Sequence, residues 1–225
     1  MNNLVCNLSR IPIKISENPV FKTCIQYEEN SELTLNESFL YTHYKQFKLN
    51  SLADIYGLKI PALKEHPVTD VFLPWYHTHP VAKYSDSAFI QSDDSSIELQ
   101  FKKIIDLYNS IKEKGYVPEQ YPNRQDGHIT GYLLNYRKIN RFYVTSGNHR
   151  VAVINAVLKD NVKYTAKFTK FDHLKPRDKR NCGFLDLADH PKVFSISNVT
   201  TWPAVSSGFL KVSEAAAIFE KYIFV

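Results

Sequence analysis

Four consecutive residues, Gly147-Asn148-His149-Arg150, carry the groups best suited to bind and transfer a phosphoryl group. An arginine can hold a phosphate by two parallel hydrogen bonds, and a histidine can donate or accept a proton near neutral pH. With the hydroxyl of Ser146 and the backbone N–H groups of a tight turn, these residues predict a phosphate site. Junctions of this composition also occur in proteins where they bind nothing, so the flanking elements must be considered.

The flanking residues predict a strand, a turn and a helix. Residues 142–145 are aromatic and β-branched, which is typical of a strand, and Gly147 can adopt the backbone angles of a sharp turn. Asn148 is expected to be the N-cap of the helix. Apolar residues then recur at helical spacing: Val151, Ile154 and Leu158. His149 and Arg150 therefore fall in the first helical turn, where the helix dipole attracts anions.

The preceding residues predict the elements that support this turn. Ser95 and Glu98 form a possible capping box, which opens a helix that ends at Gly115. Residues 129–134 and 141–145 predict two strands joined as a hairpin.

Gly-x-His-Arg between a strand and an Ala/Val/Ile-rich helix resembles the signature of the ParB/sulfiredoxin superfamily. The resemblance covers residues 66–174, about half of the chain. It includes a short first strand ending at Leu73-Pro74, a helix with a Ser110-Ile111 step, the strand pair, and a closing strand over 162–168. It implies an α+β fold, in which a small mixed sheet with packed helices holds the phosphates of a nucleotide on the motif turn. Such a fold predicts the nucleotide better than the reaction.

Two branches of the superfamily fit poorly. Its ATP-dependent sulfinic acid reductases carry a cysteine at the position of Asn148, and asparagine offers no nucleophilic sulfur. Its CTP-hydrolysing partition proteins have an acidic residue and two arginines after the glycine, followed by a helix-turn-helix domain. About fifty residues follow Lys175 here, and they show no helix-turn-helix pattern. DNA binding of the partition type is therefore the least favoured alternative.

The motif is closest to the branch of small-molecule kinases that includes free-serine kinases, because the motif of that branch also ends in His-Arg. The resemblance implies a phosphotransferase that uses ATP, ADP or another nucleotide with Mg²⁺ to phosphorylate a hydroxyl of a sugar, polyol or amino acid. The nucleotide would contact Ser146, Gly147, Asn148, His149 and Arg150. The tail around Trp202 is similar to that of proteins from bacterial surface-polysaccharide gene clusters, which points to an acceptor built into a glycan. The alternative is a non-catalytic nucleotide-binding sensor that contacts a protein partner.

A kinase also needs a base that takes the proton from the acceptor hydroxyl. The superfamily places this base at the end of the first strand, which we expect over residues 68–73. The candidates are Asp70, His77 and His79, with Asp86 as a further one, and the sequence does not separate them. His149 could also transfer a proton.

His77 and His79 lie with Trp75 and Tyr76 in a loop bounded by prolines. Alternate residues of an extended segment face the same way, so His-x-His can bind a metal ion. No other cluster of ligand residues accompanies it. We therefore expect the loop either to line a pocket for a base or sugar ring or to lie on the surface.

Composition places the chain among ordinary globular proteins of the cytoplasm. Its 28 basic and 23 acidic residues give a net charge of +5, which suits a small anionic ligand but is too dispersed to indicate nucleic acid. Cys6, Cys24 and Cys182 lack metal-ligand spacing and are expected to be free thiols in a reducing compartment. Neither a signal-peptide pattern nor an apolar run of about 18 residues is evident, so we expect no membrane span.

We expect one compact unit with three parts: an N-terminal extension packed on the core (1–65), a nucleotide-binding core (66–174), and a C-terminal extension (175–225). Residues 12–15 and 21–27 have strand-like composition, whereas 33–49 and 51–57 favour helix. A basic run at 173–181 is expected to be a solvated loop or to supplement the phosphate site. Ser213 is expected to cap a C-terminal helix.

Overall fold

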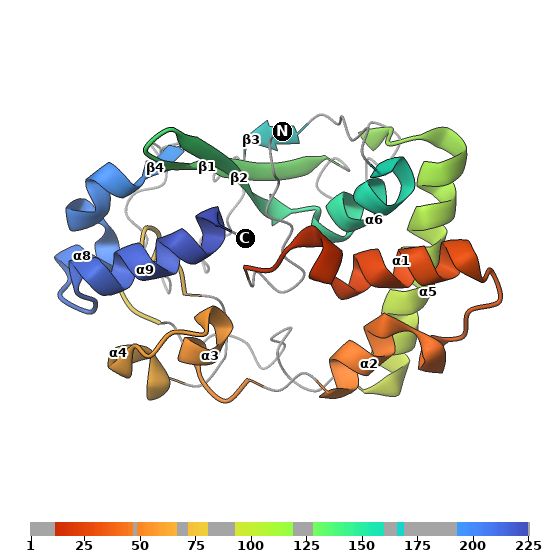
Figure 1. Ribbon diagram of the computed structural model, residues 1–225, viewed down its shortest axis with the longest axis horizontal. Helices are drawn as coiled ribbons and strands as arrows, with labels where there is room; N and C mark the ends of the chain where they lie inside the picture. The colour runs from red at the N-terminus through yellow and green to blue at the C-terminus, as the bar shows by residue number, and fades with distance from the viewer. Residues whose placement is uncertain are drawn as a thin grey trace, which may run out of the picture.

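A long β-hairpin connects the two halves of the molecule (Figure 1). The computed structural model describes residues 12–46, 49–66, 72–80, 93–118, 128–159, 166–168 and 193–224. In the hairpin, β1 (Ile129–Tyr136) pairs antiparallel with β2 (Ile139–Ser146). The turn lies at Arg137 and Lys138, and Arg137 adopts a left-handed conformation with φ of 56°. The predicted strand pair is thus confirmed, with strands slightly longer than expected.

β1 is the central strand of the sheet. β3 (Ala166–Phe168) pairs parallel with the first residues of β1, and β4 (Val193–Ser195) pairs parallel with residues further along β1. The sheet is therefore mixed, with β2 on one side of β1 and both short strands on the other. This confirms the expected α+β class with a small mixed sheet and packed helices. Part of the predicted closing strand is present as β3, while residues 160–165 lie outside the described part of the chain.

One hydrophobic core lies at the end of the hairpin where β1 begins and β2 ends. Here α6 (Asn148–Leu158) packs against α1 (Pro19–Glu29) and α5 (Asp94–Lys114), and α2 (Phe39–Gln46) adds to the same side (Figure 1). α6 is buried on several faces, through Val151, Ala152, Val153, Ile154 and Ala156. We call the hydrophobic core that these helices form with the start of β1 and the end of β2 the α6 core.

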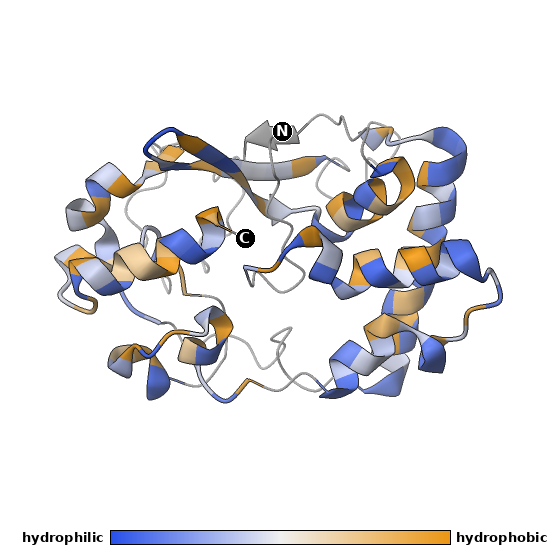
Figure 2. Cartoon of the chain, viewed as in Figure 1, coloured by the Kyte–Doolittle hydropathy of each residue, from blue (hydrophilic) through white to orange (hydrophobic). Residues whose placement is uncertain are grey.

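A second core lies under the other end of the hairpin, and we call it the α9 core. It unites α9 (Val212–Ile223) with α8 (Pro203–Ser206), α3 (Leu52–Tyr56), α4 (Pro61–Lys64) and the loop 72–80. The hairpin contributes Tyr132, Leu134 and Tyr143 to it. In Figure 2, hydrophobic stretches run along α6 and α9, whereas α2 is largely hydrophilic. Short 3₁₀ helices complete the described chain: η1 (Ile15–Glu17), η2 (Leu35–Glu37) and η8 (Ile196–Thr201).

The expectation of a strand over residues 21–27 is wrong, because these residues belong to α1. Asn18 caps this helix: its Oδ1 accepts hydrogen bonds from Val20 N at 2.9 Å and Phe21 N at 3.3 Å. Proline at the first helical position has the backbone angle that the helix needs. The capping signal decides the structure here, and it overrides the β-branched composition.

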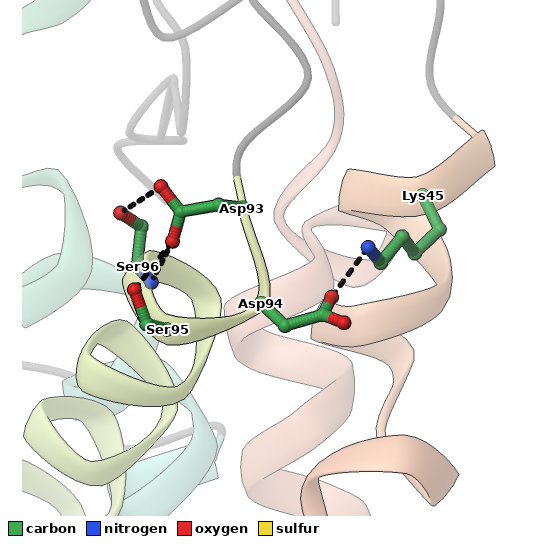
Figure 3. A network of polar contacts seen from close by, with 5 residues as sticks. All are labelled: Lys45, Asp93, Asp94, Ser95 and Ser96. Carbon is green, nitrogen blue, oxygen red and sulfur yellow. Dashed lines mark hydrogen bonds and ion pairs between the residues drawn. The ribbon is translucent and has the colours of Figure 1, made fainter.

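α5 begins earlier than predicted, with Asp93 rather than Ser95 as its N-cap (Figure 3). The Asp93 carboxylate accepts hydrogen bonds from Ser96 N at 2.7 Å and Ser95 Oγ at 2.6 Å, which lower the pKa of this carboxyl group. Glu98 instead forms an ion pair with Lys102. The predicted end of the helix at Gly115 is confirmed.

Other helix ends follow local rules. α3 ends at Gly57 in the left-handed conformation, as predicted. The N-cap of α9 is Lys211 rather than Ser213, and Glu214 Oε2 accepts the Lys211 N–H at 2.9 Å. No helix in the described part of the chain is long and apolar enough to cross a bilayer.

Cys24 is a buried free thiol in the α6 core, and burial raises its pKa to about 12. The thiol therefore stays protonated and unreactive at neutral pH. Cys6, Cys182 and the basic run at 173–181 lie outside the described residues.

Candidate functional site

The predicted strand, turn and helix over residues 142–158 are confirmed, and Gly147 forms the turn. It adopts a left-handed conformation with φ of 92° and ψ of 21°. A Cβ atom at this position would lie 3.1 Å from Ile129 Cγ1 and 3.2 Å from Ile129 Cα. Glycine is therefore required both by the backbone angles and by the close approach to β1. Gly147 is also the N-cap of α6, so the expectation that Asn148 takes this position is wrong.

The first turn of α6 presents backbone N–H groups. The first hydrogen bond of the helix runs from Val151 N to Gly147 O at 3.0 Å. The N–H groups of His149 and Arg150 come before this first bond in the chain. They therefore point out of the N-terminal end of the helix rather than into its hydrogen bonds. These groups, together with the positive end of the helix dipole, favour an anion at the turn.

The Arg150 side chain folds back across the turn. Its Nη1 donates a hydrogen bond to the His128 carbonyl at 3.1 Å, and Nη1 lies 3.3 Å from the position that a Cβ of Gly147 would take. The guanidinium therefore lies beside the helix end and connects it to the start of β1. One of its five N–H donors makes this bond, which leaves others suited to an anion.

His149 is half-buried in the first turn of α6. Burial lowers the pKa of its imidazole, and the positive charges of Arg150 and Lys103 lower it further. The ring is therefore neutral at pH 7, with one nitrogen able to accept a proton. Lys103 lies on α5, which packs beside α6 (Figure 1). No local sequence pattern links Lys103 to His149, because 46 residues separate them.

Replacing His149 with Gln should weaken the acid sensitivity of the fold. The folded protein disfavours protonation of His149, whereas a histidine in the unfolded chain has a pKa near 6.5. The unfolded state therefore binds more protons below about pH 6.5, and the free energy of unfolding should fall as the pH drops. In urea unfolding at a series of pH values, His149→Gln should show a shallower decline. His43→Gln is a positive control: burial lowers the pKa of His43 as well, so this variant should also show a shallower decline. A decline unchanged in His149→Gln would contradict the prediction.

Hydroxyl groups gather at the same end of the hairpin. Thr145 Oγ1 donates to the Thr130 carbonyl at 3.2 Å, and the two threonine hydroxyls lie 3.4 Å apart. Thr130 pairs with Ser146 in the strand register. The pairing brings Thr130 beside the turn, a placement that depends on strand register and was not predicted.

The loop that contains His77 and His79, two candidates for the base, packs in the α9 core rather than in the α6 core. His77 Nδ1 accepts the Leu73 N–H at 2.9 Å, and its ring stacks on Phe72 with centroids 6.0 Å apart. Further along the loop, His79 Nδ1 lies 2.9 Å from the Thr78 hydroxyl. The described contacts of His77 are those of a residue that fixes a turn.

The same loop is anchored to the C-terminal elements. The Pro74 carbonyl accepts the Ala204 N–H at 3.2 Å, and Ser207 Oγ donates to the Thr78 carbonyl at 3.0 Å. Asp70 and Asp86, the other candidates for the base, lie outside the described residues. Among the described residues, no group of three or more His, Cys, Asp or Glu side chains could hold a metal ion.

Comparison with family models, curated proteins and solved structures gives no match to this chain. The functional argument therefore depends on the site itself. Helix N–H groups, a guanidinium and a neutral histidine lie together at one end of the hairpin. In chemical terms, this arrangement can bind a phosphoryl group and accept a proton close to it.

Proposed function

We propose that the protein is a nucleotide-dependent phosphotransferase that phosphorylates a hydroxyl of a small molecule such as a sugar, a polyol or an amino acid. The observation that supports this most strongly is the Gly147 turn. It directs the N-terminus of α6 and the Arg150 guanidinium to the same point beside β1. Nucleotide donors of this kind are cytoplasmic, and we propose that compartment for the protein.

The charges of the turn suit a phosphate chain. A helix N-terminus carries about half a positive charge, and an arginine adds a full one with planar, bidentate geometry. Mg²⁺ that accompanies a nucleotide keeps several waters and takes few protein ligands. The turn residues offer hydrogen-bond donors rather than carboxylates, so they fit the phosphates, which would themselves hold the Mg²⁺.

His149 is the described residue best suited to act as the base in this proposal. A base at neutral pH must be unprotonated before the reaction, and the lowered pKa of His149 meets this requirement. It would take the proton as the acceptor oxygen bonds to the transferred phosphorus and the bond to the donor's bridging oxygen breaks. His77, by contrast, uses its Nδ1 to accept the Leu73 N–H.

The proposal predicts that one nucleotide stabilises the fold and that Arg150→Ala removes this effect. Thermal unfolding would be measured with ATP, ADP, CTP and GTP, each with Mg²⁺. A ligand at about 100 times its dissociation constant adds roughly 2.7 kcal/mol to the free energy of unfolding, which is readily measured. Each variant is compared with itself without ligand, because loss of the bond to His128 will also lower the stability of Arg150→Ala.

Two further measurements sharpen the test. Arg150→Lys retains the charge but loses the bidentate geometry, so we expect only part of the stabilisation. Arg137→Lys is the matched control, since this arginine lies in the hairpin turn at the opposite end of both strands. Turnover of the stabilising nucleotide with a panel of sugars, polyols and amino acids then separates a kinase from a sensor that only binds. If no nucleotide stabilises the wild type, the proposal is wrong.

A further inference from the structure

One peptide group beside the Gly147 turn is held by two side chains, one on each of its polar groups. The His128 carbonyl accepts a hydrogen bond from Arg150 Nη1 at 3.1 Å. The N–H on the other side of the same peptide bond belongs to Ile129, and it donates to Tyr116 Oη at 2.9 Å. The peptide group is planar and rigid, so a rotation that weakens one of these hydrogen bonds also weakens the other.

The two hydrogen bonds also strengthen each other. An amide N–H that donates to a hydroxyl leaves more negative charge on the carbonyl oxygen of its own peptide, which becomes a better acceptor. The guanidinium of Arg150 is a charged donor, and charged donors make the stronger hydrogen bonds. The Tyr116 hydroxyl therefore helps to fix the guanidinium through the peptide between them.

Tyr116 is placed by the end of α5. Gly115 ends this helix: its N–H donates to the Ile111 carbonyl at 2.9 Å, and its φ of 75° directs the chain out of the helix. Tyr116 follows directly and lies half-buried against the α6 core. The start of β1 is also packed against Gly147, where an added Cβ would lie 3.2 Å from Ile129 Cα. These contacts limit the movement of the peptide.

We propose that Tyr116 is a positioning residue of the phosphate site: it fixes the peptide between His128 and Ile129, which holds the Arg150 guanidinium beside the first turn of α6 before the nucleotide binds. The inference rests on the proposed function and adds to it a residue that acts through Arg150. A free arginine side chain loses rotamer freedom when it binds an anion. A guanidinium that is already held binds at a smaller entropic cost.

Tyr116→Phe and Tyr108→Phe form a matched pair of variants for the test. Each removes one hydroxyl from a tyrosine of the α6 core and leaves the ring in place. The Tyr108 hydroxyl is buried and makes no hydrogen bond within the described part of the chain. Calorimetric titration with MgATP and with inorganic pyrophosphate should show binding about three- to tenfold weaker in Tyr116→Phe, the range for ordering one long side chain. Tyr108→Phe should bind as tightly as the wild type.

Nuclear magnetic resonance of the Arg150 side chain gives a second readout, which a tyrosine with a purely structural role would not change. Without ligand, relaxation of the Nε–H group should show Arg150 to be more ordered than the exposed Arg137 of the hairpin turn. In Tyr116→Phe the order of Arg150 should fall toward that of Arg137, whereas Tyr108→Phe should leave it unchanged. Thermal unfolding of both variants confirms that they are folded under these conditions.

Three results would contradict the positioning role of Tyr116. An Arg150 side chain as mobile as Arg137 in the wild type overturns the inference without any variant. Unchanged order or unchanged affinity in Tyr116→Phe, or an equal loss in both variants, overturns it as well but leaves the proposed function standing. Absence of nucleotide binding by the wild type overturns both.

Discussion

Replacing Gly131 with alanine should lower the free energy of unfolding by about 3 kcal/mol, the upper end for forcing extra atoms into a packed site. A Cβ atom there would lie 2.0 Å from the Tyr143 carbonyl oxygen and 2.7 Å from Phe142 Cε1. The carbonyl belongs to the backbone of the partner strand, so it cannot move away as a flexible side chain could. Gly131 also adjoins the register shift between β1 and β2, where the two strands approach irregularly.

The loss should affect the whole molecule, because the hairpin contributes to both cores. Urea unfolding followed by circular dichroism and by tryptophan fluorescence would show a lower midpoint with both probes. Gly57→Asn is the control: glycine has left-handed angles there, asparagine tolerates them, and no atom lies within 4 Å of the added Cβ. Equal stability of Gly131→Ala and the wild type would contradict the close approach of the two strands.

The sequence predicted the hairpin, the turn and α6 because their signals are local. β-Branched and aromatic residues, the turn glycine Gly147 and the helical spacing of apolar residues all lie within residues 129–158. The end of α5 at Gly115 and that of α3 at Gly57 were predicted for the same reason, since both glycines adopt a positive φ that other residues avoid and that stops a helix.

Helix starts were predicted less well, because several residues compete for the same position. Asp93 and Ser95 are both good N-caps, and the structure uses Asp93. At α6 the turn needs positive φ, so Gly147 takes the position that Asn148 was expected to hold. In α1, the N-cap hydrogen bonds of Asn18 outweigh the strand-like composition of residues 21–27, which had predicted a strand.

The site residues that were missed come from distant parts of the chain. The charge of Lys103 acts on His149 only because α5 packs on α6, and His128 joins the site only because Arg150 folds across to its carbonyl. No local pattern marks either residue. Packing likewise assigns the loop with His77 to the α9 core, although the family resemblance made His77 a candidate for the base.

Replacing Trp75 with alanine should lower the free energy of unfolding by about 3–5 kcal/mol, the range for removing a large aromatic residue from a core. Trp75 is 1 % exposed, and Nε1 donates a hydrogen bond to Tyr132 Oη at 3.1 Å. Its ring lies edge-on to three others, with centroids 5.8 Å from Trp202, 5.1 Å from Phe219 and 5.4 Å from Tyr222. The loop 72–80 is thereby fixed to the hairpin and to α9 at once.

The controls separate packing from the hydrogen bond. Trp75→Phe retains an aromatic ring and loses the N–H donor, whereas Tyr132→Phe removes only the acceptor. We expect losses of about 1–3 kcal/mol for each, because a partner is left buried or a cavity remains. The double variant should lose less than the sum of the two single ones, since both residues serve one contact. Additive losses in urea unfolding would show that Trp75 and Tyr132 do not interact.

The same Trp75→Phe variant also decides what the histidines of the loop do. We place the loop with His77 and His79 in the α9 core, away from the Gly147 turn. Weaker packing of this loop in Trp75→Phe should therefore leave the stabilisation by MgATP unchanged at temperatures where the variant is folded. Turnover should likewise persist, because His149 and Arg150 lie in the first turn of α6, which packs in the α6 core. If nucleotide binding persists but turnover is lost in Trp75→Phe, the loop takes part in the reaction, and His77 or His79 replaces His149 as the base.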